Sequence, residues 1–411
     1  MRETGWRRTR LKYLASAEAG TWGEEPGEAG EDVHCIRAAD FDRQRLRVAQ
    51  DRIPVRSVES GALARLALRP GDIVLEKSGG GPDQPVGGSV LFDLGISAVC
   101  SNFAARLRPA AGVDPRFLNY LMASMYHRGV TASLAKQTTG IANLDMGAYM
   151  AFACTVPREE DQGTIAEYLD AETARLDAVI ATLSAANSLL GQWLSSQIES
   201  LMWSETPELV PLMRLTCDAR QIQYGIVLPG PDVEDGVPIV KGGNLLSGVL
   251  QADGLANTTY EIEAGYGRSR LEAGDIAFAI RGAVGACAIV PPEVAGANIT
   301  QDVAMIAHTS EVDPTWLLFA LRSTSAQSQA EARILGATIQ GINIRDLKRL
   351  KLPRVDLRVQ RDTADELVRA QSHHDSLVSA RTAQINLLKE RRQALITDAV
   401  TGQIEIPRVA A

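Results

Sequence analysis

The sequence predicts an α+β protein in which two globular α/β domains form a tandem pseudo-repeat and are separated by two long antiparallel coiled-coil helices. Two observations predict this class. Leucines recur at intervals of seven within residues 158–204, and no proline interrupts the run; this spacing is typical of a helix with one buried stripe. A shift of 198 residues then superimposes Gln162, Ala166 and Leu169 on identical residues further along the chain, which indicates a duplication.

The predicted segments alternate between globular and helical. Residues 1–157 form the first domain and 158–204 the first long helix; residues 205–353 form the second domain, and 354–411 the second long helix with a C-terminal tail. A straight helix of the first segment's length would be roughly 65–70 Å long. Because no compact domain can bury such a helix from end to end, each long helix is expected to cover the apolar stripe of the other.

The composition is that of an ordinary globular protein. The chain has 411 residues, of which 45% are apolar and 22% charged, and this length allows two or three domains. Its five cysteines occur singly, which favours a reducing cytoplasmic location over zinc sites or disulfides. No apolar run is long enough for a membrane span. The basic start of the chain is not a secretory signal, and either a frayed terminus or a phosphate contact fits it.

The net charge of −8 argues against strong binding of DNA by charge alone. The acidic excess lies in the second globular segment and in residues 158–203, which contain eight acidic and two basic side chains. A DNA-binding function would therefore need focused basic loops or a basic partner. The acidic side chains of the first helix are consistent with contact with a partner protein, and they are equally consistent with a helix face that is exposed to solvent.

In the first domain, residues 33–37, 72–75 and 99–107 are β-like runs, and glycines within 79–88 indicate a loop. Asp114-Pro115 predicts the start of a helix, because proline suits a first helical turn. A turn is expected at 139–144.

The second domain repeats this order with loops of different length. Residues 237–241 match the first run, Gly274-Asp275-Ile276 matches Gly71-Asp72-Ile73, Asp313-Pro314 opens the matching helix, and Gly341 begins the matching turn. Each match is short, and their preserved order is the evidence for a duplication.

The two long helices are predicted to meet along a seam that is apolar at its ends and polar in the middle of the second helix. Polar seam residues cost stability but fix register. Val179 is expected on the same face. The seam positions are Leu169, Leu176, Leu183, Leu190, Leu367, His374, Arg381 and Leu388. The pair His373-His374 is interpreted as solvated or seam residues, with a metal or catalytic role as the alternative.

Sequence motifs of catalysis are missing. The glycines at 79–81 lack the Lys-Ser/Thr of a phosphate loop, and the turn from Gly282 to Gly285 lies between strand-like runs. Nucleophile elbows, zinc-protease motifs and the Asn-Pro-Pro-Tyr pocket of amino-group DNA methyltransferases do not occur. The chain is interpreted as a recognition module. Two similar readers on a rigid helix pair predict a bipartite target, and DNA half-sites one turn apart lie about 34 Å from each other.

Several stretches resemble the specificity subunits of type I restriction-modification systems, and the resemblance covers nearly the whole chain. The most specific is the C-terminal helix, residues 387–404. The others are Gln223-Tyr224-Gly225-Ile226, Gly236 to Lys241, Gly274-Asp275-Ile276 with Arg281-Gly282, and Gln340-Gly341-Ile342-Asn343-Ile344. The first half departs more, since Lys77-Ser78-Gly79 replaces Arg281-Gly282.

The resemblance implies two target recognition domains that bind double-stranded DNA, each at one half of a split site. It implies a non-catalytic chain that binds no cofactor itself. Two methylation subunits would dock on the helices and use S-adenosylmethionine, and two restriction subunits that use ATP and Mg would be an optional addition. The alternatives are a non-DNA coiled-coil scaffold with two ligand-binding domains and a stand-alone enzyme.

Candidate DNA-binding residues are those with hydrogen-bonding or basic side chains in loops after strand-like runs. Each one also fits a surface or turn residue without a DNA contact. The candidates are Arg37, Lys77, Ser78, Lys136 and Gln137 in the first half, and Lys241, Asn244, Arg281, Thr338 and Gln340 in the second.

Overall fold

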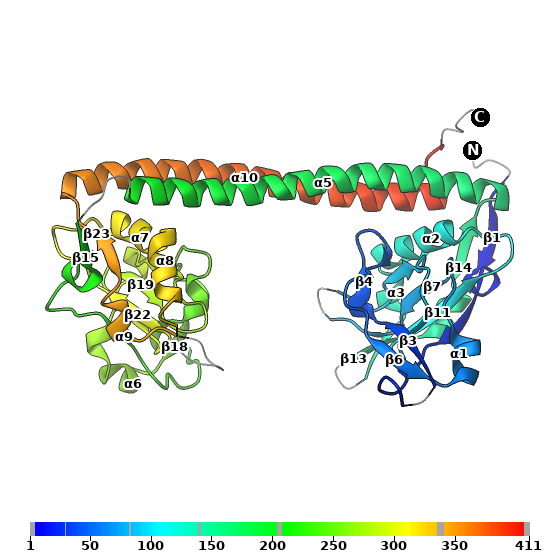
Figure 1. Cartoon of the computed structure of the whole chain (residues 1–411), viewed down its shortest axis with the longest axis horizontal. Helices are drawn as coiled ribbons and strands as arrows, with labels where there is room; N and C mark the ends of the chain where they lie inside the picture. The colour runs from blue at the N-terminus through cyan, green and yellow to red at the C-terminus, as the bar shows by residue number, and fades with distance from the viewer. Residues whose placement is uncertain are drawn as a thin grey trace. The chain divides into compact units, whose positions relative to one another are not determined.

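A computed structural model describes residues 5–28, 30–81, 84–138, 141–203, 208–334 and 341–406. The chain forms two compact units: unit 1 joins Met1–Ser184 to Thr382–Ala411, and unit 2 is Ala185–Arg381. Both predicted long helices are present, as α5 (Glu159–Met202) and α10 (Leu357–Thr401). Each of them gives one end to each unit (Figure 1).

The largest sheet of unit 1 has six strands in the order β2-β11-β7-β9-β5-β4. Strand β11 runs antiparallel to β2 and β7. All four residues of β7 are buried, as its nearly continuous apolar sequence predicts for a central strand. The strands are β2 (Ala15–Ala19), β4 (Phe41–Asp42), β5 (Arg47–Val48), β7 (Ile73–Glu76), β9 (Ser89–Leu91) and β11 (Ala104–Pro109).

Three smaller sheets complete unit 1, in the orders β10-β3-β6, β12-β13-β8 and β1-β14. Strands β3 and β10 are parallel. Because Arg7–Arg10 pairs with β14 in the ribbon before α5, the reading of these residues as a frayed terminus is wrong. The strands are β1 (Arg7–Arg10), β3 (Glu31–Ile36), β6 (Val55–Val58), β8 (Ser78–Gly79), β10 (Ala98–Cys100), β12 (Ala135–Thr138), β13 (Ile141–Leu144) and β14 (Ala153–Val156). The helices before α5 are α1 (Ser60–Leu66), α2 (Pro115–His127), α3 (Val130–Ser133) and α4 (Met146–Ala151).

The core of unit 1 joins the sheet and α2 to both long helices. Phe117 of α2, Leu169 of α5 and Ile396 of α10 belong to one buried cluster. Further along α5, Asp177 meets Arg392, which lies earlier in α10, with 3.0 Å between Oδ1 and Nε. A later residue of α5 thus contacts an earlier residue of α10, so within unit 1 the two helices run antiparallel, as predicted.

Unit 2 repeats the arrangement of unit 1 with fewer strands in its described residues. Its sheets are β16-β22-β19-β20, β18-β17-β21 and β15-β23. Trp316 of α7, Leu367 of α10 and Ile198 of α5 share one core cluster. The strands are β15 (Leu209–Pro211), β16 (Gln223–Tyr224), β17 (Val237–Val240), β18 (Ala256–Thr258), β19 (Ile276–Ala279), β20 (Cys287–Ile289), β21 (Asn298–Ile299), β22 (Val303–Ile306) and β23 (Lys351–Pro353). The shorter helices are α6 (Tyr260–Ala264), α7 (Pro314–Arg322), α8 (Thr324–Glu331) and α9 (Ile344–Leu347).

The duplication is clearest where each domain meets its long helix. Asp114 caps the N-terminus of α2 and its backbone N–H donates to Oε1 of Gln162 over 3.1 Å. Asp313 caps α7 in the same way, and its N–H donates to Oε1 of Gln360 over 2.8 Å. Both glutamines are buried. The offset of 198 residues between them, found in the sequence, is therefore structural.

The repeated Gly-Asp-Ile motif also has a structural role. Asp72 is buried and pairs with Arg108, with 2.7 Å between Oδ2 and Nη2. Asp275 is buried and pairs with Arg220 over 2.6 Å. A buried carboxylate held by a guanidinium in this way fixes the turn before a central strand.

Three local predictions differ from the structure. Val179 is 41% exposed, because the buried stripe runs through its neighbour Ile180 and adjacent residues of a helix point about 100° apart. Residues 99–107 are two strands of different sheets, β10 and β11, not one. The segment from Ile141 is strand β13 and not part of a turn.

In the described part of the chain, no helix combines the length and apolar character that a membrane span needs.

Candidate nucleic-acid interface

In unit 2, four polar side chains lie where strands end at one edge of the domain. Strands β17 and β21 are parallel, and the N–H of Thr300 after β21 donates to the carbonyl of Val240, the last residue of β17. Parallel strands end at the same edge, so Lys241 and Gln301 are brought near each other. We call Lys241, Asn244, Arg281 and Gln301 the polar edge of unit 2.

Arg281 joins this edge from the end of β19. Its Nη1 donates to Oε1 of Gln301 over 3.0 Å, and its backbone forms a bridge with Gly341. Both Arg281 and Lys241 are exposed. The side chain of Asn244 turns back, and its Oδ1 accepts the N–H of Lys241 over 2.9 Å. A bidentate contact of Asn244 with adenine needs this oxygen. Asn244 could make such a contact only after breaking its hydrogen bond to Lys241.

Unit 1 builds the matching edge from a three-stranded sheet. Lys136 of β12 stands opposite Asn143 of β13, which stands opposite Ser78 of β8. Opposite residues on neighbouring strands are about 5 Å apart, so Asn143 lies between Lys136 and Ser78 in one row across the sheet. We call Lys77, Ser78, Lys136 and Asn143 the polar edge of unit 1.

Several candidate cations of unit 1 are engaged by carboxylates. The guanidinium of Arg37 makes two hydrogen bonds to Asp40, at 3.1 and 2.8 Å, and this bonding raises the pKa of Arg37. Lys136 is largely exposed and its Nζ is 2.7 Å from Oδ2 of Asp145. Both basic side chains are therefore partly neutralised, and their pull on a phosphate is weaker than that of an isolated cation.

Three candidates lie outside what the structure describes. Thr338 and Gln340 are not among the described residues, and only the backbone of Gln137, in β12, is placed. Lys77 is half-buried, and its N–H donates to the carbonyl of Phe103 over 3.0 Å.

Sequence reasoning missed Gln301, whose side chain holds Arg281, and Asn143, which links Ser78 to Lys136. No motif signals Gln301.

A second missed feature is a pair of glycines at the matching bends, Gly20 and Gly225. A Cβ on Gly20 would lie 2.1 Å from the carbonyl oxygen of Cys100, and one on Gly225 would lie 1.9 Å from that of Ile299. The resemblance contains Gly225, so a signal for it existed.

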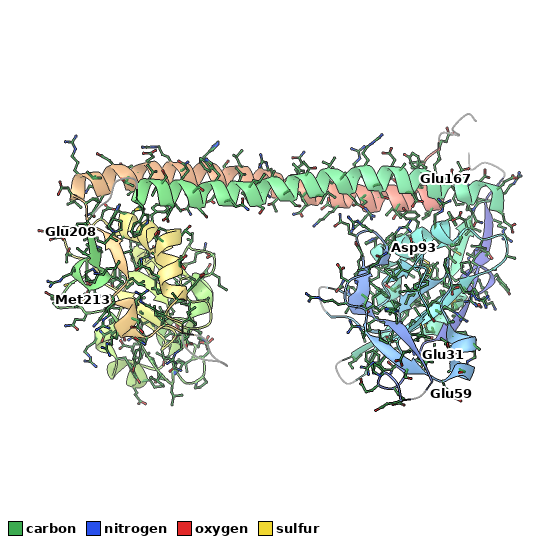
Figure 2. All side chains as sticks on the ribbon, in the orientation of Figure 1. Glu31, Glu59, Asp93, Glu167, Glu208 and Met213 are labelled. Carbon is green, nitrogen blue, oxygen red and sulfur yellow. The ribbon has the colours of Figure 1, made fainter. Side chains whose placement is uncertain are left out.

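Acidic side chains are exposed on both units, as the net charge implies. Glu31, Glu59 and Asp93 lie on the globular part of unit 1, and Glu208 lies on unit 2 (Figure 2). Cations concentrated in short edges, on a background of this sign, give a field that is local and not spread over the domain.

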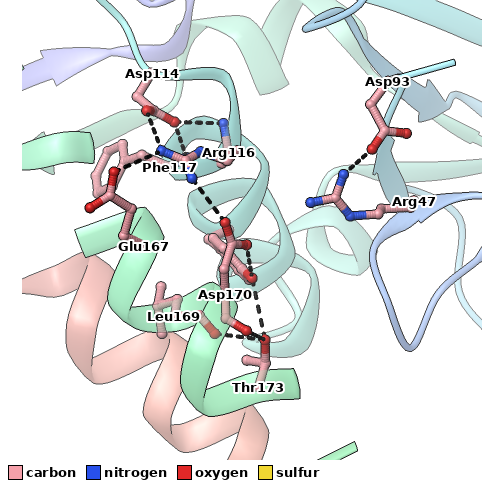
Figure 3. A network of polar contacts seen from close by, with 10 residues as sticks. Arg47, Asp93, Asp114, Arg116, Phe117, Glu167, Leu169, Asp170 and Thr173 are labelled. Atoms are coloured by element: carbon pink, nitrogen blue, oxygen red, sulfur yellow. Dashed lines mark hydrogen bonds and ion pairs between the residues drawn. The ribbon is translucent and has the colours of Figure 1, made fainter. Parts of the chain in front are cut away.

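A partly buried polar network links α2 to α5 in unit 1 (Figure 3). Nη1 of Arg116 is 3.1 Å from Oδ2 of Asp170, and the hydroxyl of Tyr120 donates to Oδ1 of the same carboxylate over 2.8 Å. Burial raises the pKa of Tyr120 to about 12, so this hydroxyl keeps its proton at neutral pH. Thr173 is 3.3 Å from the same hydroxyl. The network links α2 to α5.

The predicted seam positions have these burial states. Leu169, Leu176 and Leu367 are buried, and the others are half-buried. His374 is hydrogen-bonded through Nδ1 to Asp375 at 2.9 Å. Within the described ranges, no three His, Cys, Asp or Glu side chains gather as metal ligands. The half-buried positions are Leu183, Leu190, His374, Arg381 and Leu388.

Comparison with known proteins gives relatives of one kind. No family model matches the chain. The specificity subunit of the type I restriction enzyme EcoBI from Escherichia coli is 26% identical over 206 residues, which are 49% of this chain and 42% of that protein. The match thus spans less than half of the relative's length.

Two solved structures have the same fold over nearly the whole chain. A chain from a type I restriction-modification system, solved to explain complex assembly and conformational transition, has a TM-score of 0.73 at 18% identity, covering 98% of this chain and 100% of that one. The HsdS subunit from Thermoanaerobacter tengcongensis has a TM-score of 0.50 at 16% identity and 98% coverage of both chains. The chain therefore has the fold of the specificity subunits of type I restriction-modification systems, as its sequence motifs predict.

Proposed function

We propose that this chain is the DNA sequence-specificity subunit of a type I restriction-modification complex. Each globular domain would bind one half of a bipartite site through its polar edge, and the long helices would set the distance between the half-sites. The observation that carries the proposal is the repetition of one framework, with capped helix, buried glutamine and polar edge, in both units.

The chemistry of the two edges suits this role. Arginine and lysine contact phosphates or guanine, and amide side chains pair with base edges in the major groove. The two edges share their framework and differ in their side chains. Ser101 donates its N–H to the end of β3 as Thr300 does to the end of β17, so Asn102 takes the position of Gln301. A duplicated scaffold with different readers suits a site whose two halves differ in sequence.

The partners follow from the same proposal. Two methylation subunits would dock on α5 and α10 and transfer a methyl group from S-adenosylmethionine to an adenine in each half-site. Restriction subunits, with ATP and Mg, would act on unmodified sites. The chain itself would perform no chemistry, and the complex would work in the cytoplasm. The acidic residues of α5 are a candidate docking face for the methylation subunits.

Methylation sequencing of the host genome, with and without this gene, tests the proposal. Expected is one bipartite adenine-methylated motif that disappears with the gene. A mobility-shift assay with the methylation subunits present separates this function from a non-DNA scaffold, because a scaffold would give no sequence-dependent shift. Methyl transfer by the purified chain alone would instead favour an enzyme.

A further inference from the structure

One junction in unit 1 joins the globular domain to both long helices. Nε of Arg392 on α10 is 3.0 Å from Oδ1 of Asp177 on α5. Nε2 of Gln44, in the turn between β4 and β5, donates to the same Oδ1 over 3.0 Å. Arg392 also donates through Nη2 to the backbone carbonyl of Gln44. Three segments of the chain thus meet through one ion pair and two hydrogen bonds, which we call the Gln44–Asp177–Arg392 junction.

The turn that carries Gln44 is firmly attached to the domain. Leu46 is buried and adopts a left-handed φ of 57°. Its carbonyl accepts hydrogen bonds from Nδ2 of Asn119 and from the N–H of Leu91, both at 2.9 Å. A residue other than glycine keeps this backbone conformation only where the surrounding structure stabilises it. The turn therefore moves with the six-stranded sheet.

The same turn is linked to the polar edge of unit 1. Nη2 of Arg43 is 2.8 Å from Oε2 of Glu76, a buried carboxylate at the end of β7. Glu76 directly precedes Lys77 and Ser78. The path from Gln44 to the edge therefore consists of two peptide bonds, Gln44–Arg43 and Glu76–Lys77, and the ion pair between Arg43 and Glu76. Such a short, well-packed connection carries a change of orientation from the helices to the edge.

The junction is chemically suited to fixing geometry. Arg392 is only 6% exposed, and a planar guanidinium with five N–H groups can bind two partners in set directions. A buried arginine costs desolvation energy, which an apolar residue would avoid. The presence of arginine at this position therefore indicates that its directional contacts matter more than the stability an apolar residue would give.

Among the described residues of unit 2, the positions that match Arg392 and Asp177 do not form this junction. With the offset of 198 residues, Leu194 occupies the position of Arg392, and it packs against the apolar core. Asp375 takes the place of Asp177, but it pairs with the neighbouring His374 on its own helix. The polar tie that the structure records between α5 and the domain of unit 2 is Glu199 to the backbone N–H of Ser325, at 3.1 Å.

We infer that the Gln44–Asp177–Arg392 junction fixes the orientation of the first recognition domain on the helices and thereby the spacer length that the assembled complex accepts. The inference rests on the proposed function. One extra base pair moves a half-site by about 3.4 Å and, at about ten base pairs per turn, rotates it by roughly 35°. A domain whose orientation this junction restrains rejects such a shift, and a domain without the restraint tolerates it better.

The test uses the complex with its methylation subunits and three duplexes, which have the mapped half-sites and the native spacer, one base pair more, or one base pair fewer. Gln44→Ala removes one exposed side chain and leaves the ion pair in place. Arg392→Met removes the charge from the buried position. Arg391→Met is the matched control, because this neighbouring arginine is exposed and loses the same charge. Affinity for each duplex is measured by titration.

The expected result is a loss of spacer discrimination. The affinity ratio between native and shifted spacers falls by about tenfold in Arg392→Met and less in Gln44→Ala, within the range of coupling between contacting residues, while Arg391→Met keeps the wild-type ratio. A wild-type ratio in Gln44→Ala, which folds whatever Arg392→Met does, overturns the inference. A wild-type complex without any spacer preference would instead overturn the proposed function.

Discussion

Replacing Gln360 should weaken unit 2 more than replacing its counterpart Gln162 weakens unit 1. Oε1 of Gln360 accepts the N–H of Asp313 over 2.8 Å, and Nε2 donates to the carbonyls of Val355 at 2.8 Å and Glu311 at 3.3 Å. The side chain is 3% exposed, so water cannot replace these bonds. An unsatisfied buried group costs about 1–3 kcal/mol. With two short bonds lost, we expect Gln360→Met to cost about 2–4 kcal/mol.

Gln162 makes longer bonds, of 3.1 Å to the N–H of Asp114 and 3.5 Å to the carbonyl of Pro157. Gln162→Met should therefore cost about 1–2 kcal/mol. Methionine keeps the volume of glutamine, so the loss measures hydrogen bonds and not a cavity. Gln393→Met on the exposed side of α10 is the control.

Calorimetry or urea titration of the full chain measures both effects. For a unit of nearly two hundred residues, each kcal/mol lowers the melting temperature by roughly 2–4 °C. The two units need not melt together, so the shift is assigned from the transition that each variant moves. The reasoning would be refuted if Gln360→Met were as stable as the control variant, or if Gln162→Met lost more free energy of unfolding than Gln360→Met.

Three further outcomes are expected. Arg281→Gln should lower the slope of log affinity against log salt by about 0.9 in the assembled complex, and an unchanged slope would remove Arg281 from the interface. Gly225→Ala should distort the bend and reduce DNA binding, since its Cβ would lie 1.9 Å from a carbonyl oxygen, whereas Gly243→Ala, with open space around it, should behave as wild type. Arg270 lowers the pKa of Glu263 by hydrogen bonding. The stability that Glu263 contributes is therefore complete above its unfolded pKa of about 4.3 and is lost as pH falls through the lower folded pKa. Glu263→Gln should make stability depend less on pH in melting curves between about pH 5 and 3, and an unchanged pH dependence would exclude that carboxylate as its source.

The sequence predicts the framework well because the framework rests on local chemistry that repeats. Asp114-Pro115 and Asp313-Pro314 each combine a capping carboxylate with a residue suited to the first helical turn, and both do open helices. The leucine spacing predicts α5, and the repeat at an offset of 198 residues predicts α10. Val179 was misplaced because the buried stripe follows its neighbour Ile180, and two adjacent residues of a helix point about 100° apart and cannot both face one seam.

The candidate interface was harder to predict, because a loop residue's role depends on contacts far away in the sequence. Arg37 has the right charge and place for a phosphate contact, yet its guanidinium is held by Asp40, three residues on. Gln301 has no motif, but folding brings it against Arg281, twenty residues away. Which of these side chains contact DNA stays a prediction, and the salt-slope measurement addresses it.

Unit 1 is assembled from the two ends of the chain, since Ile396 and Val400 of α10 complete the core that contains Leu169. During synthesis, the ribosome must add about two hundred more residues after α5 begins to fold before these side chains emerge, which takes roughly 10–40 s at 5–20 residues per second. For that interval the nascent first half presents an uncovered apolar stripe. A chaperone that binds such stripes, or a partner subunit that arrives early, would raise the yield of intact protein, and a stop codon before residue 390 would leave the first half permanently incomplete.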